Sequence, residues 1–250
     1  MAAPQPQPTT AAGHTPVVSD LWNLIRAPFT PKAVFEEQQE TQRFWTPWIL
    51  VSVAFAILQI LQRPFQDRIR VLVLQHMGQA VPTASVGIGR TVTGILIGAV
   101  TVLLLAAIAA GIYYLVLLVF GGETTFKKML VVVIYGWPIA ILQQVLTLIV
   151  LSARGADSIQ SVWDVQVSFG LDLLVPSDAT LSAFLRLFLA GIGPLAIWQV
   201  VISAVGLKTL GKVSTGTAWA AAVISFVVLL AGLASLGAFG INAAMKAMGS

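Results

Sequence analysis

Long apolar runs recur along this chain, and they constrain its fold more than any other feature. One run extends over 91–120, another over 129–151 and a third over 217–236. Each is long enough to cross the hydrocarbon core of a bilayer as an α-helix, which takes about 20 residues. Only 10% of the residues are charged, whereas a soluble domain needs a more charged surface. The sequence therefore predicts an all-α integral membrane protein.

Two shorter apolar runs bring the number of expected transmembrane helices to five. The first begins with Trp45 among other aromatic residues, which prefer headgroup depth, and Arg63-Pro64 is expected to end it. The five spans form a membrane domain over 44–240, followed by a short tail over 241–250. The expected spans are 44–61, 91–120, 129–151, 194–210 and 217–236.

The part of the chain before the first span divides into two regions. Residues 1–17 are rich in Pro, Ala and Thr and are expected to be disordered. Residues 18–43 predict two short amphipathic helices, one capped by Ser19 or Asp20 and one by Thr30, which precedes a proline. Their apolar faces lie either on the membrane surface or against the protein's own loops, and the sequence leaves both readings open.

Three connecting segments have patterns of their own. The apolar part of the 65–80 segment is too short to cross the membrane, so this segment is expected to lie along the membrane interface. Strict alternation over 163–171 predicts an extended segment. The 181–190 segment is interfacial, re-entrant or part of a long fourth span; in the favoured reading a Gly-Pro break follows it and Arg186 snorkels to the interface.

The third span carries the most distinctive residues. Tyr135 precedes Pro138, which predicts a kink in the helix. Gln143 and Gln144 follow within two turns. Polar side chains inside a membrane commonly bond to a neighbouring helix, so a packing role is the favoured reading and contact with a substrate is the alternative.

A short echo of this span occurs in the fourth. Pro138-Ile-Ala-Ile-Leu-Gln143 resembles Pro194-Leu-Ala-Ile-Trp198-Gln199, and the two helices are expected to run in opposite directions. An inverted repeat of a transporter has this appearance, although matches of six residues arise readily by chance in an apolar chain. In the second span, Gly94, Gly98 and Gly111 provide a small-residue face suited to close contact with another helix.

The sequence lacks the parts of most catalytic sites. It contains no cysteine, its two histidines are His14 and His76, and no expected span contains a carboxylate. General acid–base, metal and nucleophile–base arrangements therefore lack members. We expect no enzymatic activity and no cofactor. The small excess of Lys and Arg fits membrane orientation and does not suggest nucleic-acid binding.

Charge alone does not orient the chain. With the N-terminus inside, seven Lys and Arg residues lie on each side. The two shortest inner loops each carry a lysine pair, and short loops weigh most in the positive-inside rule. A cytoplasmic N-terminus is therefore expected.

The chain resembles bacterial members of the Ypt-interacting protein (Yip) domain family over about 21–240. The likeness rests on the order and spacing of several short motifs. They are Leu24–Pro28, Trp45–Pro47, Gly121-Gly122, Tyr135-Gly136-Trp137-Pro138 and Leu195–Leu207.

The resemblance implies five transmembrane helices, a cytoplasmic N-terminus and no known enzymatic reaction. Eukaryotic relatives bind Rab-type GTPases in vesicle traffic, but no acidic docking motif stands in the tail here, so that role is not transferred. We expect a non-enzymatic interaction or membrane-organising protein of the bacterial cytoplasmic membrane, whose partners are the bilayer and a protein partner or a second copy. The alternative is a small-solute or ion transporter or channel that uses the Pro-broken third and fourth spans.

Overall fold

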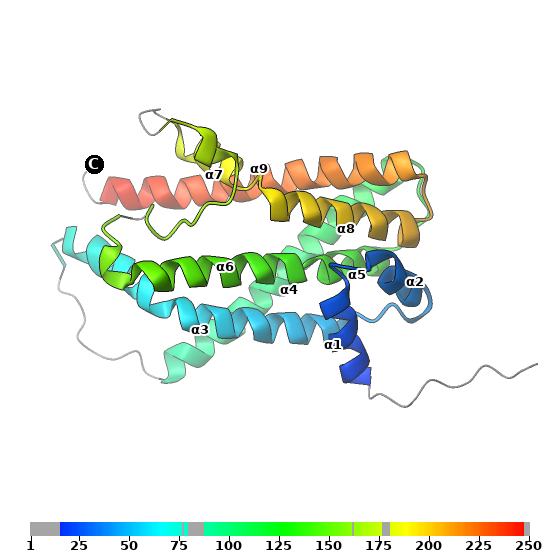
Figure 1. Ribbon diagram of the computed structural model, residues 1–250, viewed down its shortest axis with the longest axis horizontal. Coiled ribbons are helices and arrows are strands. Elements are labelled where there is room, and N and C mark those ends of the chain that lie inside the picture. The colour runs from blue at the N-terminus through cyan, green and yellow to red at the C-terminus, as the bar shows by residue number, and fades with distance from the viewer. Residues whose placement is uncertain (1–15, 77, 80–87, 162, 177–180, 248–250) are drawn as a thin grey trace, which may run out of the picture.

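The computed structural model describes residues 16–76, 78–79, 88–161, 163–176 and 181–247, and within them it forms a bundle of long helices (Figure 1). Five of the described segments are long and apolar enough to cross a membrane. The expected all-α membrane fold with five spans is confirmed. Its long helices are α3 (Trp45–His76), α4 (Ile88–Val119), α5–α6 (Phe126–Gly136 and Pro138–Arg154), α8 (Pro194–Gly211) and α9 (Thr215–Ala247).

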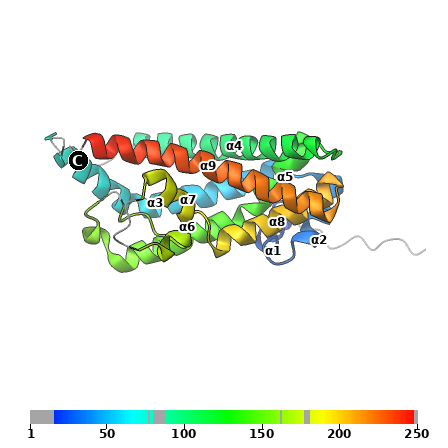
Figure 2. The same ribbon diagram turned by 90° about the horizontal axis from the view of Figure 1, so that it is seen from above.

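The bundle is layered. Seen from above, α4 and α9 lie together on one side, and α6 and α8 lie on the other (Figure 2). Helix α5 packs against both α4 and α8 and so joins the two sides. The hydrophobic core gathers around this helix, because most of its residues are buried.

Helix α3 differs from the sequence prediction. It continues through Pro64 to His76 as one helix of 32 residues, whereas Arg63-Pro64 was expected to end the span and 65–80 to lie along the interface. Proline is tolerated inside membrane helices because neighbouring groups satisfy the backbone that it frees. Arg63 therefore lies within a continuous helix.

Two short helices precede the bundle. Helix α1 (Pro16–Arg26) lies crosswise to the long helices, and α2 (Pro31–Thr41) packs on α8 (Figure 1). Thr30 is the N-cap residue of α2, as expected, with Pro31 in its first turn. The expectation that Ser19 or Asp20 caps the first helix was wrong, because α1 begins earlier. Residues 1–15 of the expected disordered tail, His14 among them, lie outside the described residues.

Breaks precede two prolines, Pro138 within the third span and Pro194 at the start of the fourth. Helix α5 ends at Gly136 and α6 begins at Pro138, where the sequence predicts a kink. The amide of Trp137 donates to the Ile134 carbonyl at 3.3 Å, which satisfies a group that Pro138 cannot reach. Helix α7 (Ala183–Ala190) is likewise separated from α8 by Gly191–Gly193.

The connection before α7 also differs from the sequence prediction. The segment expected to be extended over 163–171 forms no strand in the described residues. Residues 163–165 form a turn, 166–169 have no regular secondary structure, and the 3₁₀ segment η2 (Leu171–Leu174) follows; η1 (Ala156–Ser158) precedes them. Asp164 Oδ2 accepts the amides of Gln160 and Ser161 at 2.8 and 2.7 Å, so the chain folds back locally instead of extending.

Helix α9 extends further than the sequence predicts. This helix runs to Ala247, so most of the expected tail over 241–250 is helical. Arg186, on α7, lies exposed with its guanidinium carbon 4.9 Å from the centre of the Trp163 ring. The break after α7 is present, and Arg186 is outside the long spans.

Candidate functional site

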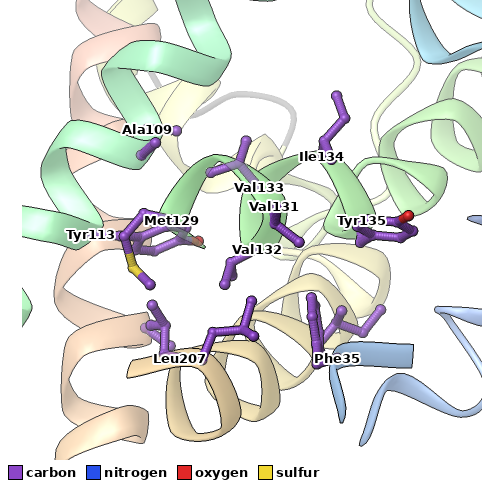
Figure 3. Packing of buried hydrophobic residues seen from close by; sticks show 14 of the residues in the cluster. Phe35, Ala109, Tyr113, Met129, Val131, Val132, Val133, Ile134, Tyr135 and Leu207 are labelled. Atoms are coloured by element: carbon purple, nitrogen blue, oxygen red, sulfur yellow. The ribbon is translucent and has the colours of Figure 1, made fainter. Parts of the chain in front are cut away.

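Tyr135 lies at the centre of the packed end of the bundle. It is fully buried, and its ring meets that of Phe35 edge-on with 6.4 Å between centroids (Figure 3). Phe35 comes from α2 and enters beside Gly206 of α8. A Cβ atom at Gly206 would stand 2.8 Å from Cζ of Phe35, so only glycine lets α2 approach this closely. Tyr135 is therefore a packing residue of α5.

Trp198 holds the link between α1 and α2. Its indole Nε1 donates to the Pro28 carbonyl at 2.9 Å, across 170 residues of sequence. Arg26 also pairs with Glu37 and donates to Asn23 at 2.9 Å. These contacts fix α1 relative to α2 and α8.

Helix α1 faces the bundle with its polar side, together with Leu24. Asp20 and Asn23 are buried, and Asp20 pairs with Arg43 at 3.5 Å. Burial raises the pKa of the Asp20 carboxyl above its ordinary value, although Arg43 opposes the shift. The opposite side of the helix is apolar and exposed, as is Phe29 in the turn that follows: Val17, Val18, Leu21, Trp22, Ile25 and Phe29. We call this row the α1 apolar face.

Gln143 lies beside the break between α7 and α8. It lines a cleft of about 10 Å³ together with Gly191 and Gly193 from the α7–α8 break, which is room for about one water molecule. Pro194 begins α8 beside this cleft, as Pro138 begins α6. Within the described residues, no hydrogen bond joins Gln143 to Gln199. The echoed glutamines are thus not paired.

Gln144 points to a different and larger cavity. Its Oε1 accepts a hydrogen bond from Nε2 of Gln62 on α3 at 3.2 Å. Both side chains line a cavity of about 440 Å³ between α3, α4 and α6. The neighbouring Gln59, Arg63 and Gln66 line it as well. We call this space the glutamine cavity.

The structure separates the three glycines of the expected contact face. Gly94 lines the glutamine cavity, and Gly98 faces Gln59, whose Oε1 would be 3.1 Å from an added Cβ. Gly111 has no neighbouring heavy atom within 4 Å of that position. One glycine therefore contacts α3 within the chain, and the other two border open space.

Sequence reasoning missed the polar residues of α3. Gln59, Gln62, Arg63 and Gln66 recur at helical spacing and so share one face. That signal is visible in the sequence, but it was lost because the first span was ended before Arg63. Among the residues that the structure describes, no three His, Cys, Asp or Glu side chains gather to hold a metal.

A family model covers most of the chain. Residues 23–237 match the model of the family described as the Yip1 domain. The chain belongs to the Yip1 domain family. Comparisons with the curated proteins and with the solved structures find no match.

Membership in the Yip1 domain family and the five apolar segments together identify a multi-pass membrane protein. The matched range begins inside α1 and ends inside α9. It therefore includes the glutamine cavity and the packed end around Tyr135, so both belong to the Yip1 domain itself.

Proposed function

We propose that this Yip1-domain protein is a non-enzymatic membrane-organising and interaction protein that acts through α1. One observation carries the proposal: α1 buries its polar side and exposes its apolar face. Trp22 is 60% exposed and Phe29 is 76% exposed, whereas Asp20 is 1% exposed. Exposure of such a face to water is unfavourable, whereas its burial in the headgroup layer of a bilayer or against an apolar partner is favourable.

Contacts with the bundle hold α1 in one position, so its apolar face has a fixed orientation. Asp20–Arg43 ties the helix to the segment before α3, and Trp198 ties its end to α8. A helix held in one leaflet by a spanning bundle displaces lipid in that leaflet alone. The same fixed face offers a docking surface to a protein partner or to a second copy.

The test is a photo-crosslinking residue at Trp22, with Lys32 as the matched control. Lys32 lies on α2 with an 80% exposed side chain and no part in the apolar face. Lipid adducts at position 22 but not at 32 support membrane organisation, and a protein adduct of discrete mass at 22 supports partner or self binding. Equal adducts at both positions, or none at 22, contradict the proposal.

The proposal includes an orientation and a location. The lysine pairs of the two short loops favour a cytoplasmic N-terminus, and the resemblance to bacterial relatives favours the bacterial inner membrane. In that orientation α1 and α2 lie on the cytoplasmic side. A protease-protection assay on the N-terminal tail tests this, and cleavage only from the outer side contradicts it.

Transport is the second candidate, and one observation favours it. The cleft at Gln143 borders the break before Pro194, and α6 and α8, which begin at Pro138 and Pro194, run in opposite directions (Figure 1). Broken helices of this kind form transport sites. Flux in proteoliposomes that is lost in Gln143→Leu and Gln199→Leu, with folding intact, would support transport over membrane organisation.

A further inference from the structure

The glutamine cavity has a polar lining that the proposed role of α1 does not use. Helix α6 contributes Gln144 to this lining, and α3 contributes Gln59, Gln62, Arg63 and Gln66. No carboxylate is found among its described lining residues. Such a lining combines several amide N–H donors with a guanidinium, which is the donor set that suits a phosphate group.

The depth of the cavity limits what can occupy it. Arg63 lies 18 residues after Trp45 on one continuous helix, or about 27 Å further along at 1.5 Å per residue. Because the hydrocarbon core is about 30 Å thick, Arg63 stands near the membrane face opposite to that of Trp45. Phosphate groups of lipids are found at this level.

The cavity also opens sideways and is apolar on part of its wall. Gln59, Ile60 and Gln66 are exposed on the surface of the bundle, and Ile95 completes the apolar part. A molecule that diffuses within the bilayer can reach such a site directly. Its volume of about 440 Å³ lies within the ordinary range for small-ligand sites.

We propose that the glutamine cavity binds the phosphate-bearing headgroup of an anionic phospholipid from the leaflet opposite to α1. Arg63 supplies the positive charge. The carboxamides of Gln59, Gln66 and Gln144 donate to phosphate oxygens, and the acyl chains leave over Ile60 and Ile95. This site is separate from the α1 apolar face, so each proposal can fail without the other.

The test uses a filled cavity and a matched control on the same helix. Gly94→Leu places a side chain in the cavity, and Gly111→Leu places the same side chain in open space elsewhere on α4; neither position has a heavy atom within 4 Å of the added Cβ. Both changes raise helix propensity alike. Gln144→Leu is a second variant that removes a donor without adding bulk.

Native mass spectrometry of the purified full chain then measures binding of phosphatidylglycerol, phosphatidylcholine and soluble glycerol 3-phosphate. Phosphatidylglycerol is expected to bind at least about tenfold more tightly than phosphatidylcholine, a difference of about 1.4 kcal/mol. Gly94→Leu and Gln144→Leu should weaken the binding of phosphatidylglycerol, and Gly111→Leu should leave it unchanged.

Three results would overturn the proposal. One is equal binding of the two lipids by the wild-type protein. Another is an unchanged affinity for phosphatidylglycerol in both Gly94→Leu and Gln144→Leu. The third is glycerol 3-phosphate that competes as well as the lipid, because the site would then read a free phosphate. Thermal unfolding of each variant verifies that the measured chains are folded, and a Gly94→Leu chain that fails to fold leaves Gln144→Leu to decide.

Discussion

The two halves of the third span, α5 and α6, differ in how deeply they are buried. In α5, seven of the 11 residues are buried, from Met129 to Gly136. In α6, two of the 17 are buried, Ile139 and Leu151. The α5 half is enclosed by α2, α4 and α8, and the α6 half borders the glutamine cavity and the Gln143 cleft.

This difference separates a structural end of the protein from an adaptable one. At the α5 end, aromatic rings and glycine contacts fix α2 against the bundle. At the α6 end, polar side chains border open space. Close-packed regions have one arrangement and resist change, so ligand binding is expected where α6 lies and rigid support where α5 lies.

The largest expected effect is at Phe35. Phe35→Ala empties a fully buried site between Tyr135 and Gly206, and such changes lower the free energy of unfolding by about 3–5 kcal/mol. Thermal or denaturant unfolding in detergent measures this. Phe29→Ala, at a 76% exposed ring, is the control and should change stability by less than about 0.5 kcal/mol. Similar losses in both variants would show that α2 is not part of a fixed core.

The next effect compares one hydrogen bond from each end. Tyr113 donates to Ser203 at 3.0 Å in the buried interface of α4 and α8, and Tyr113→Phe should cost about 0.6–2 kcal/mol. The Gln62–Gln144 bond is exposed, so Gln144→Leu should stay within about 0.5 kcal/mol. Unfolding of both variants under one condition gives the comparison. A greater loss of stability in Gln144→Leu than in Tyr113→Phe would contradict the expected order.

The smallest effect is a pH dependence at the α1 end. Burial raises the pKa of Asp20 above its ordinary 3.8, so the folded state holds its proton more tightly than the unfolded state. The free energy of unfolding therefore falls as pH rises from about 3.8 through the raised pKa, and Asp20→Asn should remove this fall.

Asp164 supplies the opposite case. Backbone amides of Gln160 and Ser161 lower the pKa of this carboxyl, so its contribution is present above about pH 3.8 and is lost as pH falls through the lowered value. Asp164→Asn should remove stability at neutral pH. Unfolding curves from pH 3 to 7 measure both variants, and slopes of the same sign would contradict this account.

Hydropathy was sufficient to predict the five spans, because each helix must satisfy its own backbone in lipid. The sequence also predicted Thr30 as a helix N-cap and a break at Pro138, since proline fixes φ and lacks an amide donor. Pro64 has the same chemistry, yet α3 continues through it. Local sequence could not distinguish the two prolines, because packing against α4 and α6 decides whether a helix continues.

The candidate site was predicted less well. Gln144 was singled out, but its partners on α3 were not, because their helical spacing matters only if the helix continues past Arg63. Tyr135 and Trp198 were chosen for their distinctiveness, and their contacts with Phe35 and Pro28 span long sequence distances. The alternation over 163–171 was misread, because side-chain bonds to Asp164 and close backbone contacts at Gly170 fold that segment.

Cysteine labelling tests the difference between the two halves most directly, because the chain contains no cysteine of its own. Single substitutions are placed at Val133, Leu142 and Gln144, and the protein in lipid nanodiscs is treated with a membrane-impermeant maleimide. Val133 is buried in α5, Leu142 is 44% exposed outside the cavity, and Gln144 lines it. Maleimide needs a thiolate, and a thiolate needs water.

If the α6 half borders a hydrated polar cavity, Gln144→Cys reacts at least about tenfold faster than the other two, although Leu142 lies at nearly the same depth. Equal rates at positions 142 and 144, or rapid labelling at 133, would contradict the account.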